Sequence, residues 1–235
     1  MRPTITKSLQ DLFSKEVISY VIKTAILALG LSIVIIWFFW DNLTRMIGSF
    51  LGWIPWEWLQ TTGVGAVNIL LVYILFIIIV SLLTSLTSET LLKKLAQRHY
   101  PNISANGIPN ISTSLLLTLK ATGVFILLFI PAIPLLFVPI LGQIIILYLW
   151  SILIKKPTMY DVSALFALEE KVDTGRKATT LAMTASLFNY VPLLNIFTPV
   201  FAQILFLHYA LSYSKSKNVT DHLSSAHTQG SSQNS

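Results

Sequence analysis

The stretch YVPLLNIFTPVFAQILFLHY, from Tyr190 to Tyr209, is apolar and uncharged, yet it contains two prolines in its first half. Proline lacks a backbone N–H and clashes with the preceding helical turn, so a helix should end near Pro192 and again near Pro199. In lipid, each backbone group freed by such a break needs a partner from protein or water. The stretch therefore predicts a helix that is interrupted within a membrane.

The composition of the whole chain also indicates a membrane protein. Of the 235 residues, 54% are hydrophobic and 11% are charged, whereas a soluble domain carries about 25% charged residues. The chain has no cysteine and a net charge of +6. Its basic residues form no stripe interleaved with aromatic residues, so we expect the lipid bilayer as a partner and no nucleic acid.

Four uncharged or nearly uncharged stretches are long enough to enter a bilayer. Val17 to Trp40 has 24 residues, with Lys23 as its one charge, and Gly63 to Ser88 has 26. Each matches one full span of about 20 residues. Ala121 to Ile154 has 34 residues and Ala178 to Ser214 has 37. These two are too long for one span and short for two, which with a turn would need about 45 residues.

Both longer stretches are interrupted by proline, at Pro131, Pro134, Pro139, Pro192 and Pro199. We expect each stretch to form a helical hairpin that enters the membrane and turns back inside it, near Pro134 and near Asn195. The predicted fold is an all-α integral membrane protein with two full transmembrane helices and two re-entrant helical hairpins. The alternative is six transmembrane helices with tight outer turns, because helices tilt and bilayers thin.

The two ends of the chain differ from this membrane domain of residues 17–213. Residues 1–16 are predicted to form a cytoplasmic amphipathic arm, since Ile5, Leu9, Leu12 and Phe13 recur at helical spacing. The arm has two acidic residues and no cleavage site, so we do not expect a cleavable signal peptide. Residues 214–235 are rich in Ser, His, Gln and Asn and are predicted to form a disordered cytoplasmic tail.

The distribution of basic residues predicts the orientation. Fourteen of the sixteen Lys and Arg residues lie in the arm, in the loops that follow the second and third stretches, and in the tail, whereas the loop 41–62 holds only Arg45. By the positive-inside rule, both termini are cytoplasmic. Five tryptophans mark the loop 41–62 and the helix before it as the far interface: Trp37, Trp40, Trp53, Trp56 and Trp58.

Two motifs resemble a known family. FIPAIPLLFVP, from Phe129 to Pro139, and SLFNYVPLLNIFTPV, from Ser186 to Val200, are similar to the proline-rich turn and the Pro-x-x-Asn-x-x-x-Pro-Val signature of the CysZ family of sulfate permeases. That family is grouped with the eukaryotic etoposide-induced membrane proteins. The resemblance implies a bacterial inner-membrane protein with two long helices and two partly inserted hairpins, assembled as a homodimer or a larger oligomer, that admits sulfate to the cytoplasm.

The chain departs from the family at two places. Ser19 and Tyr20 stand where the sulfate permeases have a pair of arginines at the start of the first long helix. In LTSLTSETLLKKLAQRHYP, from Leu83 to Pro101, Glu89 keeps an acidic residue after the second span, but Lys93 stands where a later glutamate would fall. His208 lies where many members of the family end the second motif.

Several polar residues are candidates for a substrate path, and each has a structural alternative. Asn195 and Asn189 either cap helix ends freed by proline or line a polar path, and the two roles are compatible. The amides Gln143 and Gln203 are expected to join helices. His208 is either hydrogen-bonded between helices or part of a proton relay.

The charged candidates lie nearer the cytoplasmic side. Lys23 is expected to extend to the interface, where it could attract an anion. Glu89 and Lys93 either begin a solvated helix or belong to the site. The predicted substrate path therefore consists of Asn195, His208, Lys23, Glu89 and Lys93.

The chemistry of the chain indicates no enzyme. No zinc-protease, nucleophile-elbow or phosphate-loop motif occurs, and we expect neither a cofactor nor a metal site. Two functions remain open. The first is uptake of sulfate or a related small anion, and the second is a non-transporting membrane protein that organises partners or lipids.

Overall fold

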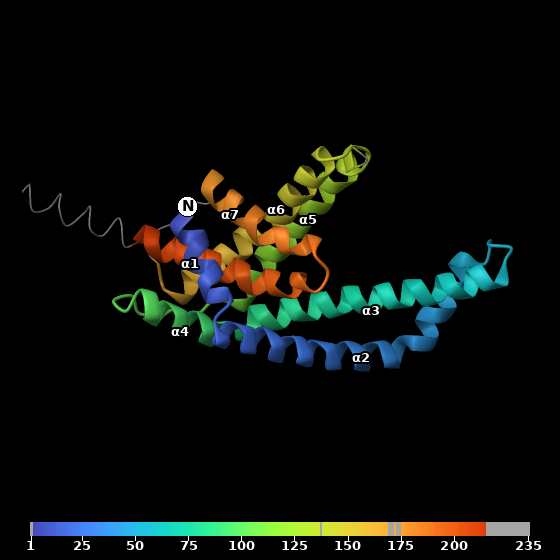
Figure 1. The fold of residues 1–235 in the computed structure, drawn as a ribbon, viewed down its shortest axis with the longest axis horizontal. Helices are drawn as coiled ribbons and strands as arrows, with labels where there is room; N and C mark the ends of the chain where they lie inside the picture. Colours follow the sequence, from blue (N-terminus) through green and yellow to red (C-terminus); the bar gives the residue numbers. More distant parts are fainter. Residues whose placement is uncertain (1, 137, 169–171, 173–174, 215–235) are drawn as a thin grey trace, which may run out of the picture. The chain divides into compact units, whose positions relative to one another are not determined.

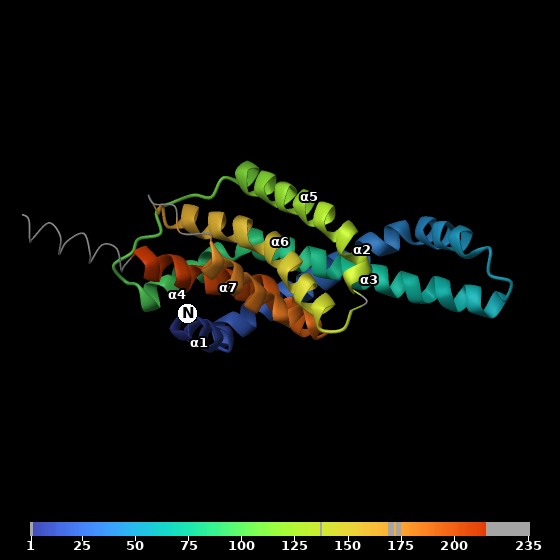
Figure 2. The same ribbon diagram turned by 90° about the horizontal axis from the view of Figure 1, so that it is seen from above.

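The computed structural model describes residues 2–136, 138–168, 172 and 175–214, and in them the regular structure is helical. The chain divides into two compact units. We call residues 18–88 the hairpin unit, and the residues up to Val17 together with those from Glu89 onward the core unit. Figures 1 and 2 show the helices of each unit.

The hairpin unit consists of two long helices, α2 (Lys15–Leu51) and α3 (Glu57–Thr87). The hydroxyl of Ser14 accepts a hydrogen bond from the Val17 N–H (3.3 Å) at the start of α2, as an N-cap residue does. The first expected span lies inside α2, and the second lies inside α3 except for its last residue, Ser88, which is the C-cap. The loop expected at 41–62 is mostly helical instead, because α2 continues eleven residues past Trp40 and only residues 52–56 separate it from α3.

Apolar packing and four polar contacts join α2 to α3 as an antiparallel pair. Ala28 packs with Ile79 and Val80 between the two helices. The polar contacts lie along its length: Tyr20 OH to Thr87 Oγ1 (2.8 Å) and to the Thr84 carbonyl (3.4 Å), Asn68 Nδ2 to Thr44 Oγ1 (3.3 Å) and Gln60 Nε2 to the Gly48 carbonyl (3.4 Å). Such interhelical hydrogen bonds fix the register of two apolar helices in lipid.

The core unit begins with α1 (Arg2–Leu12) and continues with α4 (Glu89–His99), α5 (Ile111–Leu136) and α6 (Leu141–Leu165). The side chain of Asn110 caps α5 by accepting hydrogen bonds from the N–H groups of Ser112 (2.9 Å) and Thr113 (3.3 Å). α5 and α6 then pack side by side as an antiparallel pair (Figure 2).

The turn between α5 and α6 differs from the sequence-based expectation. Pro131 and Pro134 lie inside α5, and the chain turns at Val138 to Ile140, around Pro139. The Leu141 N–H donates to the Pro139 carbonyl (2.7 Å), and Ile140 has a φ of 67°. Proline is tolerated in apolar helices where local adjustment and neighbouring helices satisfy the freed backbone groups. The chain therefore turns near Pro139, five residues after the position near Pro134 that the sequence predicted.

The end of the core unit contains the stretch with the second pair of prolines. α7 (Arg176–Ser186) leads into two short 3-10 helices, η1 (Leu187–Tyr190) and η2 (Leu194–Phe197), and then into a final α-helix, residues 198–214. The chain turns at Pro192, beside Leu193 with a φ of 72°. Pro199 lies in the first turn of helix 198–214, where proline costs no hydrogen bond.

Four described helices are long and apolar enough to cross a membrane. They are α2, α3, the segment Ile111–Ala132 of α5 and the segment Leu194–Ser214. α7 has 11 residues, a length of about 16 Å, which falls short of the hydrocarbon core of about 30 Å. The chain is therefore a multi-pass membrane protein, and its described helices do not supply six full spans.

Candidate functional site

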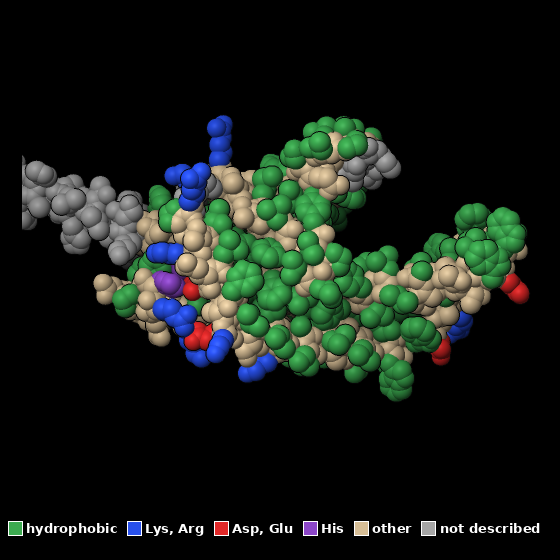
Figure 3. Space-filling model, viewed as in Figure 1, with side chains coloured by type: hydrophobic (Ala, Val, Ile, Leu, Met, Phe, Trp, Pro, Cys, Tyr) green, Lys and Arg blue, Asp and Glu red, His purple; other side chains and the backbone are tan. Residues whose placement is uncertain are grey.

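Three ionisable side chains from distant parts of the chain meet inside the core unit. The Nε2 atom of His208 lies 2.8 Å from Asp11 Oδ2, and the Nε2 atom of His99 lies 3.0 Å from Asp11 Oδ1. The hydroxyl of Tyr100 lies 3.2 Å from His208 Nδ1 and 3.4 Å from the His208 carbonyl. We call these four residues the Asp–His cluster. In Figure 3, histidine and acidic side chains are visible between α1 and α4.

Local structure explains how each residue reaches the cluster. Asp11 lies on the buried face of α1. Ser8, Asp11 and Leu12 are the buried residues of this helix. His99 is the last residue of α4, and the Tyr100 N–H bonds back to the Ala96 carbonyl (2.6 Å). His208 projects from the fourth turn of helix 198–214. The cluster thus joins the first helix of the chain to the last.

The hydrogen bonds determine where the protons lie. An ionised carboxylate only accepts, so both histidines donate from Nε2 to Asp11. In neutral His208, Nδ1 is then an acceptor, and the Tyr100 hydroxyl donates to it. The His99 and His208 rings also pack edge to face, with centroids 5.0 Å apart.

Burial and hydrogen bonding act in opposite directions on Asp11. Its side chain is 6% exposed, and this desolvation alone would raise the pKa of the carboxyl. The hydrogen bonds from His208 and His99 outweigh it, so the pKa of Asp11 lies below its ordinary value. Burial, with the nearby Asp11 charge, raises the pKa of Tyr100. The cluster therefore holds a carboxylate anion and a neutral phenol.

Among the predicted path residues, His208 is the one that the structure places in the cluster. Its side chain is fully buried and both ring nitrogens have partners. This geometry agrees with the expected hydrogen bond between helices. The same chain of groups, Tyr100–His208–Asp11–His99, is also one along which a proton could move. His208 therefore keeps both roles that the sequence left open.

The predicted asparagines lie on either side of the turn at Pro192. Asn195 lies in η2 and is buried, with 8% of its surface exposed. Asn189 lies in η1, where its Oδ1 accepts a hydrogen bond from Thr198 Oγ1 (2.8 Å) at the start of the final helix. This bond joins two side chains across the turn and satisfies no backbone group, so it links η1 to the final helix without capping it.

The two predicted intramembrane glutamines have different environments. Gln143 is exposed in α6, and its backbone carbonyl, not its side-chain amide, accepts a hydrogen bond from Tyr190 OH (2.7 Å). Gln203 is buried in helix 198–214, and its Oε1 has no hydrogen-bond partner among the described residues. A buried amide oxygen of this kind marks a place where water or a donor would be stabilised.

The charged candidates lie apart from the Asp–His cluster. Glu89 and Lys93 form an ion pair (2.6 Å) one turn apart on the exposed face of α4. Such a pair fits the solvated helix start that was the structural alternative, and pairs of this kind contribute about 0.3–0.5 kcal/mol. Lys23 is exposed on α2, in the hairpin unit.

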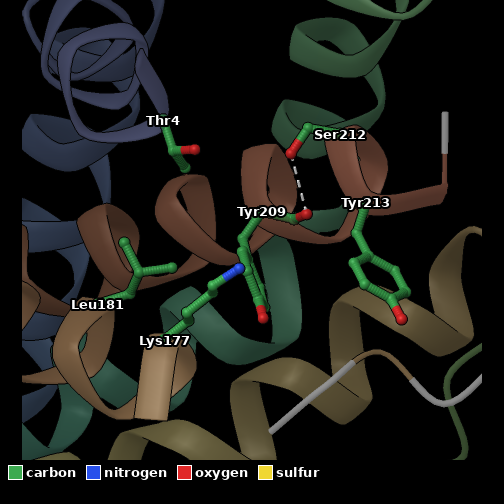
Figure 4. A pocket seen from close by; sticks show the side chains of 6 residues that line it. All are labelled: Thr4, Lys177, Leu181, Tyr209, Ser212 and Tyr213. Atoms are coloured by element: carbon green, nitrogen blue, oxygen red, sulfur yellow. Dashed lines mark hydrogen bonds between the residues drawn. The ribbon is translucent and has the colours of Figure 1, made fainter. Parts of the chain in front are cut away.

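A small open pocket lies near the C-terminal end of helix 198–214 (Figure 4). Thr4, Tyr209, Ser212 and Tyr213 line it together with Leu181 and Lys177. Its volume is about 190 Å³. The lining therefore combines one cation with four hydroxyl-bearing residues and has no acidic side chain. Lys177 had been expected on the cytoplasmic side with other basic residues.

Sequence reasoning did not identify Asp11, His99 or Tyr100 as site residues. A signal was present for Asp11, because Leu12 and Ser8 define the buried face of α1 and Asp11 lies on it. His99 and Tyr100 end α4, and their sequence context alone resembles an ordinary polar helix end. Their proximity to His208, more than 100 residues away, required the tertiary fold.

Comparison with known proteins identifies the family. No curated protein and no solved structure matches the chain. A family model described as "Sulfate transporter CysZ/Etoposide-induced protein 2.4" matches residues 4–199. This range covers α1 to the start of helix 198–214 and includes the two proline motifs. The chain therefore belongs to the sulfate transporter CysZ/etoposide-induced protein 2.4 family.

Proposed function

We propose that this protein is an inner-membrane permease for sulfate or a related small anion. The observation that carries the proposal is the family match over residues 4–199 of a chain with four candidate spans. The description of the family names sulfate transport. The substrate of this chain is therefore a proposal that rests on family membership.

The polar features of the core unit support an anion path. An anion that enters a bilayer must exchange water for donors that do not trap it. Helix 198–214 continues directly from η2, and the N–H groups of Leu194, Asn195 and Thr198 already bond to the carbonyls of Val191 and Asn195. The support for an anion here is the partial positive charge at the start of a helix, which follows the turn at Pro192. Asn195 and Gln203 add buried amides along the same segment. A fixed cation here would hold the anion too tightly, and none occurs between Lys177 and Lys215.

Basic side chains would then serve to collect anions. Lys177, in its pocket with hydroxyl groups, is the best-placed candidate in the core unit (Figure 4). Arg176 precedes it, Lys93 and Lys94 of α4 are further candidates in the core unit, and Lys23 is a separate candidate in the hairpin unit. Lys93 contributes less net charge than the sequence suggested, because it is paired with Glu89. Attraction of this kind weakens as salt screens it.

The experiment is uptake of labelled sulfate by proteoliposomes. We expect the wild-type protein to exceed empty liposomes, and Asn195→Leu to lose uptake while keeping its unfolding temperature. Asn189→Leu is the matched control, because Asn189 is bonded to Thr198 and should affect stability first. Uptake that is normal in folded Asn195→Leu would exclude this path. Unfolding of Asn195→Leu would leave Asn195 with the capping role alone.

We also propose that the two proline turns remain inside the membrane, with both termini cytoplasmic. Ile140 and Leu193 are 75% and 74% exposed at the two turns. Since the chain has no cysteine, single variants Ile140→Cys and Leu193→Cys can be tested with an impermeant thiol reagent added outside. Neither should react, whereas a cysteine at Trp53, between α2 and α3, should. Rapid reaction at both turns would show that they reach the outer surface.

A non-transporting role that organises partners or lipids is the second candidate. The observation in its favour is the lack of the arginine pair, because Tyr20 instead forms a hydrogen bond to Thr87 inside the hairpin unit. Folded wild-type protein that takes up no sulfate, phosphate or chloride above empty liposomes would favour this candidate. Uptake of any of these anions, blocked by Asn195→Leu, would exclude it.

A further inference from the structure

We propose that the Asp–His cluster is a site for a divalent transition metal, with Zn²⁺ as the best-suited ion. The ligands would be one carboxylate oxygen of Asp11 and the Nε2 atoms of His99 and His208. These ligand atoms all lie within 4.8 Å of one another. This proposal does not depend on transport, and it differs from the sequence-based expectation of no metal.

The distances fit a shared metal. Zinc binds histidine nitrogen and carboxylate oxygen at about 2.0–2.2 Å. Two tetrahedral ligands at that distance lie about 3.3 Å apart. His208 Nε2 lies 2.8 Å from Asp11 Oδ2, and His99 Nε2 lies 3.0 Å from Oδ1, the other oxygen of the same carboxylate. Each contact is about 0.3–0.5 Å shorter than this value, so the side chains would move apart slightly and the carboxylate would turn one oxygen toward the ion. Two histidines and one carboxylate leave a fourth position for water, as in many zinc sites.

A hydrogen-bond partner is available for the ring nitrogen of His208 that would not bind the metal. A bound histidine usually donates its other ring N–H to an oxygen, which fixes the tautomer. When a metal takes Nε2 of neutral His208, the Nε2 proton leaves and Nδ1 gains one, so the charge of the ring does not change. Tyr100 OH, 3.2 Å from Nδ1, then becomes the acceptor and can donate to the His208 carbonyl instead. The same hydroxyl therefore serves both forms.

Burial and access also suit a metal. Asp11 and His208 are 6% and 0% exposed in their side chains, so water competes little for their ligand atoms. The side chain of His99 is 25% exposed and gives an ion a route to the site. Since the ligands come from α1, α4 and helix 198–214, one ion would fasten the first helix of the chain to the last. Metal binding of this kind stabilises the folded state.

The test uses the full chain in detergent, carrying a tag without histidine and freed of metal by a chelator. The background variant carries His222→Gln and His227→Gln, because tail histidines can bind zinc nonspecifically. We expect one Zn²⁺ per chain by mass spectrometry and calorimetry, and a higher unfolding temperature with zinc. His99→Gln, which leaves the Asp11–His208 bond intact, should weaken zinc binding by at least about 100-fold. Tyr100→Phe should weaken it by about 10–100-fold.

A second measurement works on the wild-type fold. Diethyl pyrocarbonate modifies accessible neutral histidine, so His99 should react in metal-free protein and be protected by one equivalent of zinc. The measurement uses the background variant without tail histidines, in which the fully buried His208 should stay unmodified with and without zinc. Absence of stoichiometric zinc binding would overturn the proposal and leave the cluster as a hydrogen-bonded network. Zinc binding that persists in His99→Gln, with His99 unprotected in the background variant, would overturn it as well.

Discussion

Helix 198–214 and the α2–α3 pair are both apolar, but they face different surroundings. In the apolar window of Leu194–Ser214, 78% of the residues are buried inside the protein, compared with 22% in α2 and 17% in α3. Phe201, Ile204, Leu205 and Leu207 are each at most 1% exposed. On the hairpin unit, Trp37, Phe38 and Ile69 are 80%, 75% and 72% exposed, and Figure 3 shows hydrophobic side chains over its surface.

This difference teaches that apolar sequence alone does not reveal what covers it. A helix that is apolar on every side can lie in lipid or at the centre of a bundle. Helix 198–214 has its partners in the core unit, so its side chains contribute to stability through packing. The faces of α2 and α3 that protein does not cover are suited to contact with lipid tails. Lipid surrounds such a face both before and after the helices associate, so these side chains contribute little to the free energy of folding.

The largest expected effect comes from matched phenylalanines. Phe206→Ala should destabilise the protein by about 3–5 kcal/mol, because Phe206 is fully buried and its loss leaves a cavity. Phe38→Ala, at a side chain that is 75% exposed, should change the free energy of unfolding by less than about 1 kcal/mol. Thermal and chemical unfolding in lipid nanodiscs measures both. Equal losses would show that the faces of the hairpin unit are packed against protein, and would break the comparison.

Two glycines sharpen the comparison. A β-carbon at Gly107 would lie 1.8 Å from the Ala164 carbonyl oxygen at the end of α6. The Gly107 N–H also donates to the Leu165 carbonyl (3.0 Å), so backbone would have to move. Gly107→Ala should therefore cost about 1–3 kcal/mol.

The control is Gly30→Ala in α2, where an added β-carbon meets nothing within 4 Å. This change should be neutral or stabilise the helix by about 0.5–1 kcal/mol. The measurement is again the unfolding free energy in nanodiscs. Destabilisation by Gly30→Ala comparable to that of Gly107→Ala would indicate a neighbour packed against this face of α2.

The smallest effect is expected from a single hydroxyl in the hairpin unit. Tyr20→Phe removes the hydrogen bond to Thr87 and should cost about 0.6 kcal/mol, the usual value for a hydrogen bond between apolar helices. Tyr148→Phe, at an exposed tyrosine of α6, is the control and should be silent. A loss above about 2 kcal/mol for Tyr20→Phe would mean that polar contacts, rather than the apolar packing of α2 with α3, hold the hairpin unit together.

Much of the fold follows from local sequence. The composition indicated a membrane protein, the two spans lie inside α2 and α3, and the family resemblance agrees with the family match. The positions of breaks were less predictable. Pro131 and Pro134 lie inside α5. Pro139 and Pro192 lie at turns, and Pro199 lies in the first turn of helix 198–214. A proline favours a break, but the packing of neighbouring helices decides whether one forms.

The sequence by itself determined that the chain enters a membrane and which family it belongs to, because both depend on composition and on short local motifs. The tertiary structure alone decided which apolar helix is wrapped in protein and which is left to lipid. It also decided that Asp11, His99, Tyr100 and His208 meet. Burying a carboxylate requires partners for its charge, and these partners come from chain segments up to 197 residues apart. No local pattern records such a distance.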